Sequence, residues 1–318
     1  MLINEINQAI WVPNMDLRQL NSLVALAETG FNVTLAAKQL YLVQSAVSQH
    51  LAQLEKELGT QLFVRKGKRL IALTAAGEEV LNYARQALSI RENILAIGRD
   101  HVEENSGILR IGTTHTQARY VLPAVIRAFR HAFPTVSLQI HQGTPQELVE
   151  MTINDRVDFS ICTEELGENS ALNAIPCYRW NRSLIALKGH PVLVDRSLSL
   201  ERICDYPLIT YTFGFTGASH MQTTFARAGL QPNVVLTAAD TDVIKTYVRE
   251  GMGVGLIASM AYSAEQDRDM EIRDLGNMLP WETTWVAYHK DKYLRRFQQK
   301  FIDLMESMVL ENGVTKAP

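Results

Sequence analysis

The stretch "QSAVSQHLAQLEKELGTQLFVRKGKRLIALT", residues Gln44–Thr74, combines a polar helix start, a glycine stop and a cationic hairpin. Its apolar residues fall at helical spacing until Gly59, which predicts a helix that ends at that glycine. The following residues predict a strand, a turn at residues 66–68 and a second strand. No acidic residue lies between Glu57 and Glu78, so the hairpin concentrates positive charge in a chain of net charge −3.

Two shorter helices are predicted upstream of this stretch. Apolar spacing indicates a helix from Leu17 that ends at Gly30, and a second helix over Leu35–Leu40 with Thr34 as its N-cap. Three helices and a basic hairpin are typical of a winged helix-turn-helix, which we expect over residues 15–73. We expect residues 1–14 to be a poorly ordered N-terminal extension.

The residue types of this module suit double-stranded DNA. The start of the second helix of such a motif faces base edges, whereas the hairpin supplies cations for phosphates. From Thr29 to Leu54 the chain has one lysine and no acid that would repel phosphates. The predicted base-reading residues are Gln44, Ser45, Ser48 and Gln49, and the predicted phosphate contacts are Arg65, Lys66 and Lys68. The alternative is a generic three-helix bundle whose polar face is merely solvated.

A long helix follows over residues 74–106, capped by Thr74 and ended by Asn105–Gly107. It is too long and too lightly covered for a core helix, so it predicts pairing with a partner helix, often its own copy. Residues 107–318 then alternate strands and helices, which indicates α/β layers with largely parallel sheets. We expect two lobes, one over residues 107–178 and 281–318 and one over residues 179–280, with a ligand cleft between them.

Hydroxyl side chains gather where several of these strands end. Thr114, Thr116 and Gln117 follow the first strand, Thr163 ends a later strand, and Thr216 lies in a glycine-rich segment before a helix. Hydroxyl and amide groups at such positions can bind a small anion without a counter-charge. The alternative for the first group is an ordinary threonine N-cap.

Composition and motifs exclude several other classes. A sequence pI near 6.3 argues against bulk coating of nucleic acid, and three widely spaced cysteines indicate reduced thiols in a cytoplasmic protein. We find no signal sequence, membrane span, metal-ligand spacing, nucleophile elbow or phosphate loop, so we expect no enzyme activity, catalytic residue, metal or cofactor. The remaining rival is a solute-binding protein or enzyme whose N-terminal helices bind other proteins instead of DNA.

The segments "LRQLNSLVALAETG" and "LAAKQLYLVQSAVSQHLAQLEKELGTQLFVRKGKRLIALTAAG" resemble the DNA-binding domain of LysR-type transcriptional regulators. The sequence departs from the family pattern at Ala46, where many members have proline, and at Leu51. The resemblance implies that the long helix dimerises and that the remaining α/β part binds an effector. It also implies tetramers through the effector domains. We expect double-stranded DNA, a small anionic effector and the transcription machinery as partners.

Further segments are similar to the CysB/Cbl-like subgroup of this family, among them "TTHTQARYVLP", "IPCYRWNRSLIAL", "YPLITYTFGFTGAS" and "TDVIKTYVREGMGVGLIASMA". This similarity implies an activator of sulfur-assimilation genes that binds sulfate, thiosulfate or an acetylated serine. It adds Trp180 to the effector-binding residues, which are then Thr114, Thr116, Gln117, Thr163, Trp180 and Thr216. The alternative within the family is a regulator of another pathway with a different small carboxylate effector.

Overall fold

The structure is a computed structural model that describes residues 15–67, 69–102, 106–163, 166, 169–194, 198–212, 218–308 and 315–316. The predicted extension, residues 1–14, therefore lies outside the described residues. The chain forms two compact units that divide between Ala96 and Ile97, within helix α4 (Ala75–Val102). No helix in the described part of the chain is long and apolar enough to cross a membrane.

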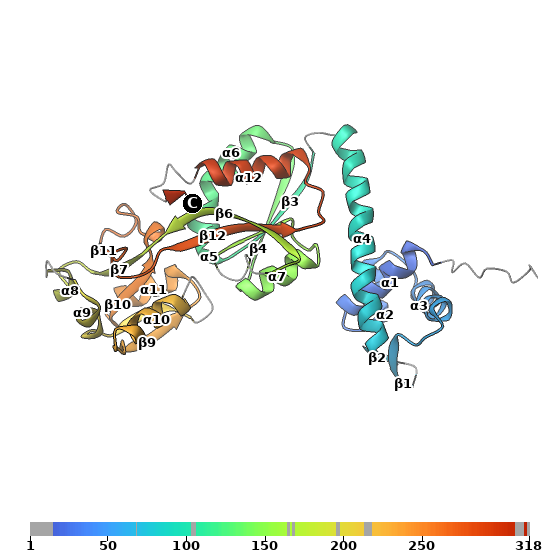
Figure 1. The fold of residues 1–318 in the computed structure, drawn as a ribbon, viewed down its shortest axis with the longest axis horizontal. Coiled ribbons are helices and arrows are strands. Elements are labelled where there is room, and N and C mark those ends of the chain that lie inside the picture. Colours follow the sequence, from blue (N-terminus) through green and yellow to red (C-terminus); the bar gives the residue numbers. More distant parts are fainter. Residues whose placement is uncertain are drawn as a thin grey trace, which may run out of the picture. The chain divides into compact units, whose positions relative to one another are not determined.

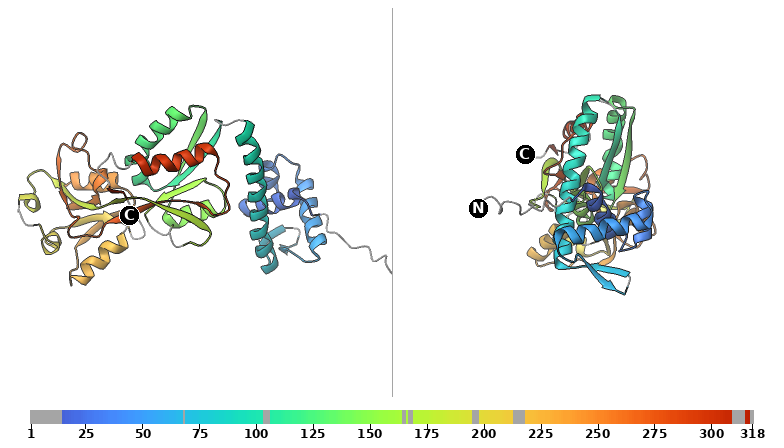
Figure 2. Two further views of the ribbon diagram at one scale, coloured as in Figure 1. Left: turned by 45° about the horizontal axis from the view of Figure 1, so that its top comes forward. Right: turned by 90° about the vertical axis from the view of Figure 1, so that its right-hand side faces the viewer.

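The first unit is the predicted winged helix-turn-helix. Its elements are α1 (Leu17–Glu28), α2 (Val33–Gln39), α3 (Gln44–Leu58), β1 (Phe63–Lys66), β2 (Arg69–Leu73) and the first turns of α4. The strands β1 and β2 pair antiparallel, and Figure 2 shows this hairpin projecting from the helices of its unit. The helices enclose one apolar core, whose fully buried side chains include those of Leu23, Leu26, Ala36, Val47 and Leu54.

Local signals set most of these boundaries. Asp16 and Gln19 form a reciprocal capping box before α1, and Gly59 ends α3 in a left-handed conformation at φ +64°. The prediction that Thr34 caps α2 is wrong. Asn32 is the N-cap, because its side chain accepts hydrogen bonds from the backbone N–H groups of Thr34 and Leu35.

The second unit contains two mixed sheets (Figure 1). The six-stranded sheet has the order β13-β6-β12-β5-β3-β4, and the five-stranded sheet has the order β11-β7-β10-β8-β9. The bounds in the first sheet are β3 (Gly107–Thr113), β4 (Val136–Gln142), β5 (Phe159–Cys162), β6 (Leu172–Trp180), β12 (Glu282–His289) and β13 (Thr315–Lys316). Those in the second are β7 (Arg182–Leu187), β8 (Leu208–Tyr211), β9 (Val234–Ala238), β10 (Val254–Ala258) and β11 (Met270–Asp274).

The expectation of largely parallel sheets is wrong. Strand β3 pairs parallel with β4 and β5, and β8 pairs parallel with β9 and β10, as expected for strands joined through helices. The other pairings, made by β6, β7, β11, β12 and β13, are antiparallel. These strands lie next to the points where the chain passes between the sheets, at Asn181 and at residues 275–281.

Helices cover both faces of each sheet. In the six-stranded sheet, α6 (Leu122–Ala132) and α12 (Arg296–Met308) pack together on one face, and α7 (Pro145–Ile153) covers the other (Figure 1). The five-stranded sheet packs α8 (Pro191–Val194), α9 (Leu200–Cys204) and α10 (Ala218–Arg227) in one apolar cluster and α11 (Thr241–Arg249) in another. The short helices α5 (His115–Tyr120) and η2 (Ser259–Ala261) lie at the ends of β3 and β10.

The end of α4 is anchored in the second unit through Asp100. Asp100 is 5% exposed, and its carboxylate lies 3.5 Å from the guanidinium Nε of Arg295. It also accepts hydrogen bonds from the Tyr293 hydroxyl at 3.2 Å and from the Arg296 backbone N–H at 3.4 Å. Since Arg296 is the first residue of α12, one buried carboxylate joins the last turn of α4 to the start of α12.

Candidate functional site

The exposed face of α3 presents all four predicted base-reading residues. Gln44, Ser45, Ser48 and Gln49 are exposed, because the helical period turns Val47, Leu51 and Leu54 into the core. The Gln44 amide oxygen accepts a hydrogen bond from the Thr34 hydroxyl at 3.4 Å. His50 is half-buried, and its Nδ1 lies 2.8 Å from the Ser22 hydroxyl. The predicted reading face is therefore accessible within this unit, and His50 turns toward α1.

The predicted phosphate contacts of the hairpin differ in whether they pair with an acidic side chain. Lys66 is exposed, whereas one Nη of Arg65 pairs with Glu55 on α3 at 2.6 Å. The other Glu55 oxygen accepts the backbone N–H groups of Leu62 and Phe63. Lys68 lies outside the described residues. Sequence reasoning treated the cations of the hairpin as equivalent, but one of them helps to fasten the hairpin to α3.

At the end of β3, the structure places Thr114 and Thr116 at the junction of the two sheets. Thr114 occupies the N-cap position of α5, but its side chain makes no capping hydrogen bond, so the threonine N-cap alternative is wrong. Thr116 is 1% exposed, and its hydroxyl has no hydrogen-bond partner within the described part of the chain. Buried hydroxyl groups are normally paired, so this one is suited to an added ligand.

Gln117 is held in a defined orientation by two residues of the same sheet. Its amide oxygen accepts a hydrogen bond from the Tyr178 hydroxyl, and its Nε2 donates to the Thr284 hydroxyl at 3.3 Å. The Thr284 hydroxyl also lies 3.5 Å from that of Thr163. Thr284 thus links two of the predicted effector residues, and burial raises the pKa of the Tyr178 phenol above its ordinary value.

Trp180 ends β6 beside a buried ion pair. The indole is 2% exposed, and its Nε1–H has no hydrogen-bond partner among the described residues. The Arg182 guanidinium lies 5.2 Å from the indole ring and pairs with Glu282 at 2.8 Å, with both charged groups buried. The second Glu282 oxygen lies 2.9 Å from Nδ1 of His220 on α10. Thr216, in the segment before α10, lies outside the described residues.

Sequence reasoning missed Tyr178, Arg182, Glu282 and Thr284. Arg182 and Glu282 begin β7 and β12, where the chain passes between the sheets, and no strand was expected over residues 172–180, which form β6. The partners Arg182 and Glu282 are separated by 100 positions, so no local pattern relates them. The signal available in the sequence was the run "CYRWNRS", which concentrates aromatic, cationic and hydroxyl side chains between apolar segments.

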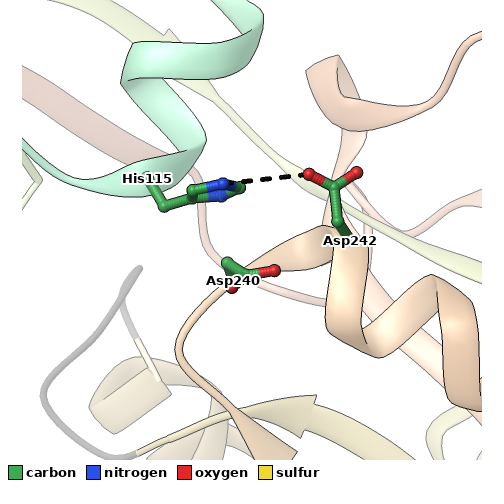
Figure 3. A group of neighbouring side chains, drawn as sticks. All are labelled: His115, Asp240 and Asp242. Carbon is green, nitrogen blue, oxygen red and sulfur yellow. Dashed lines mark ion pairs between the residues drawn. The ribbon is translucent and has the colours of Figure 1, made fainter.

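His115, Asp240 and Asp242 form a further group, whose nearest ligand atoms lie within 4.8 Å of one another (Figure 3). The carboxylates already have protein partners. Asp242 pairs with Nε of Arg119 at 2.7 Å and accepts a hydrogen bond from the Tyr120 hydroxyl at 2.8 Å. Asp240 is the N-cap residue of α11. A cation would have to displace the Arg119 guanidinium, so this group fits a contact between α5 and α11 better than a metal site.

Comparisons with known proteins agree with this arrangement. A model of the bacterial regulatory helix-turn-helix protein of the lysR family matches residues 17–78, and a model of the LysR substrate binding domain matches residues 103–309. The HTH-type transcriptional regulator SsuR of Burkholderia cenocepacia is 41% identical over 290 residues, which are 91% of this chain and 94% of that protein.

The HTH-type transcriptional regulator CysB of Haemophilus influenzae is 41% identical over 303 residues, 95% of this chain and 94% of that protein. The crystal structure of the cofactor-binding domain of the Cbl transcriptional regulator matches with a TM-score of 0.62 and 38% identity. That match covers 67% of this chain and 96% of the solved domain. The similarity to these regulators therefore extends over both units.

Proposed function

Because the chain belongs to the LysR family of DNA-binding transcriptional regulators, which are not enzymes, we propose that it activates sulfur-assimilation genes in response to a small anion. The proposed effectors are sulfate, thiosulfate or an acetylated serine, bound at the junction of the two sheets. The proposal follows the similarity to CysB/Cbl-like regulators, and the cytoplasm is the corresponding compartment.

One observation in the effector domain carries the anion proposal. The Thr116 hydroxyl is buried and makes no hydrogen bond of ordinary geometry with the described residues, next to the Thr114 side chain, which makes no capping hydrogen bond, and the oriented amide of Gln117. An oxyanion accepts several hydrogen bonds at once and would pair these donors. The proposed effector contacts are Thr114, Thr116, Gln117, Thr163, Trp180 and Thr216.

For the DNA-binding unit, we assign base reading to α3 and phosphate binding to the hairpin. The proposed base contacts are Gln44, Ser45, Ser48 and Gln49, and the proposed phosphate contacts are Arg65, Lys66 and Lys68. Accessibility of the α3 face and of Lys66 supports this assignment. Because Glu55 already partly neutralises the guanidinium of Arg65, Lys66 is proposed as the stronger phosphate contact.

A homodimer through the linker helix, residues 74–106, completes the proposal, with tetramers through the effector domains. Tyr83, Ile90, Ile94 and Ile97 are exposed on α4 and recur along one face of it. A stripe of this kind is what a second copy of the helix would cover. Two DNA-binding units per dimer would raise the affinity for paired half-sites.

The test is calorimetry of the full-length chain against sulfate, thiosulfate, O-acetylserine and N-acetylserine. We expect at least one of them to bind, and Thr114→Ala to weaken it roughly tenfold or more, because a hydrogen bond to a charged group is lost. The matched control is Thr246→Ala, which removes a hydroxyl on the exposed side of α11. If none of the four binds, or if Thr114→Ala binds as tightly as the wild type, the effector site is misassigned.

A further inference from the structure

Two buried hydroxyl groups of the five-stranded lobe contact each other at the ends of β8 and α11. Tyr211 ends β8 and is 2% exposed, and Thr241 begins α11 and is fully buried. Their oxygens lie 2.5 Å apart, and the Tyr211 oxygen also accepts the Ala258 backbone N–H at 3.1 Å. Neither residue belongs to the lobe that carries Thr114, Thr116 and Gln117.

The two lobes meet at this point. The start of α5 lies against the start of α11, where Asp242 accepts the Tyr120 hydroxyl and pairs with Arg119 (Figure 3 shows His115 facing Asp240 and Asp242). Tyr211 accepts the backbone N–H of Ala258, the residue before η2, and η2 packs against α5, which carries Thr116. Burial raises the pKa of the Tyr211 phenol, while hydrogen bonds from the Ala258 N–H, Thr241 and Thr116 lower that pKa less strongly. Thr116 and the Tyr211–Thr241 pair are therefore neighbours from opposite lobes.

These three hydroxyls carry more protons than the described residues can accept. Tyr211 and Thr241 share one O···O contact, which only one of their two protons can occupy, and no second contact is found for either proton among the described residues. The Thr116 hydroxyl makes no hydrogen bond of ordinary geometry within the same described ranges, and the nearby Tyr211 oxygen is its closest acceptor on the evidence of the phenol's pKa. At least one buried donor of this group is thus left without an acceptor in the described part of the chain, although buried donors are normally paired.

We infer that Tyr211 and Thr241 form the second half of the anion site: Tyr211 donates its phenolic proton to an effector oxygen, and Thr241 donates to Tyr211. This inference rests on the proposed function, and it makes the oxyanion a bridge between Thr116 of one lobe and Tyr211 of the other. Thr241 is a positioning residue, since its proton reaches the phenol oxygen and leaves the phenol proton for the ligand. Chained hydrogen bonds of this kind strengthen one another.

The surrounding charges permit an anion here. The carboxylate of Asp242 is paired with Arg119 at 2.7 Å, and that of Glu282 is paired with Arg182 at 2.8 Å. Because burial raises the pKa of the Tyr211 phenol above its ordinary value, the group stays protonated near neutral pH and remains a donor. A neutral donor set lined by paired charges suits an oxyanion whose oxygens only accept hydrogen bonds.

The test uses calorimetric titration of the full-length chain with the strongest binder among sulfate, thiosulfate, O-acetylserine and N-acetylserine. Tyr211→Phe, which keeps the ring, is expected to weaken binding roughly tenfold to a hundredfold, the usual effect of losing a hydrogen bond to a charged group. Thr241→Val should weaken it by a smaller factor, and Thr241→Ser, which retains the hydroxyl, should restore binding close to that of the wild type.

Tyr262→Phe is the matched control, because it removes a phenol hydroxyl of the same lobe that donates to the Met270 carbonyl. It should leave the affinity unchanged. Melting temperatures without ligand separate folding from binding, and if Tyr211→Phe fails to fold, the Thr241→Val and Thr241→Ser pair decides. Unchanged affinity in Tyr211→Phe, or equal losses in Thr241→Val and Thr241→Ser, would overturn the inference.

Failure of this inference and failure of the proposed function give different results in these titrations. If the wild type binds and Thr114→Ala weakens binding while Tyr211→Phe does not, the proposed function stands and only the second half of the site is wrong. If the wild type binds none of the four compounds, the proposed effector class fails, and the role of Tyr211 and Thr241 fails with it.

Discussion

Glu55 shows how one side chain joins two parts of the DNA-binding unit. One carboxylate oxygen accepts two backbone N–H groups at the start of the hairpin, and the other pairs with Arg65 on β1. The hairpin is therefore fixed to the helix whose exposed face we expect to read bases. The same contact partly neutralises Arg65, so the cations of the hairpin differ in the charge that they can offer to phosphates.

Lys66 is exposed and pairs with no carboxylate among the residues that the structure describes, so its removal should weaken DNA binding independently of sequence. Lys66→Ala should lower the magnitude of the slope of log affinity against log salt by about 1, because one phosphate contact is lost. The measurement is fluorescence anisotropy with a duplex that the protein itself selects from a random pool.

Two companion variants calibrate this result. Lys300→Ala, on the exposed side of α12, should leave the slope unchanged, and Arg65→Ala should change it less than Lys66→Ala does. A salt slope in Lys66→Ala equal to that of the wild type would show that the hairpin tip does not bind phosphates.

At the scale of elements, the exposed apolar stripe of α4 predicts self-association. Ile94 is 65% exposed, so Ile94→Asp should hardly change the stability of the monomer. In a dimer that pairs two copies of α4, the same substitution would bury a charge in the interface. Sedimentation velocity should show the dimer dissociating at concentrations roughly tenfold or more above those of the wild type. The control is Glu92→Lys, which changes the charge of a side chain on a different face of α4, and this variant should sediment as the wild type does.

The segment after η2 is held by a buried carboxylate. Asp267 is 3% exposed and pairs with Lys245 at 2.6 Å and with Arg249 at 2.9 Å. Burial alone would raise the pKa of Asp267, but hydrogen bonds from Lys245, the Ser263 backbone and Arg249, together with the charge of Lys245, hold it below its ordinary value. A carboxylate of lowered pKa stabilises the fold above its unfolded pKa, and that contribution disappears as pH falls through the folded pKa.

Asp267→Asn should therefore destabilise the protein by about 3 kcal/mol at pH 7, since two cations lose a buried partner. The difference in melting temperature from the wild type should begin to shrink as the pH falls below about 4, where the unfolded carboxyl becomes protonated, and should disappear once the pH is below the lower native pKa. Asp269→Asn, which removes an exposed partner of Arg249, should have a much smaller effect. A destabilisation by Asp267→Asn that is independent of pH would contradict the ion-pair explanation.

Local signals explain why some elements could be predicted and others could not. The helices and hairpin of the first unit follow from apolar spacing and from Gly59, and the error at α2 arose because Asn32 and Thr34 are both good capping residues. Strand β6 was missed because Asn173 and Pro176 interrupt its apolar pattern. Tyr178 and Trp180 of this strand lie in the candidate site, so without the strand the sequence did not predict their contacts with Thr284 and Arg182 either.

At the scale of the whole molecule, the candidate site needs both sheets. Thr114, Thr116 and Gln117 could be found from the sequence because they adjoin one strand end. Arg182 and Glu282 could not, because each lies where the chain passes between sheets and their pairing depends on the fold. A ligand that contacts both sheets can favour one arrangement of the lobes, provided that its affinity differs between the arrangements.

Reciprocal coupling between effector and DNA tests this account most directly. Calorimetric titration of the effector into the full-length chain, alone and bound to its selected duplex, should give affinities that differ by roughly fivefold or more, as allosteric coupling requires. Equal effector affinity in the presence and absence of DNA would contradict the claim that the anion site controls the DNA-binding unit.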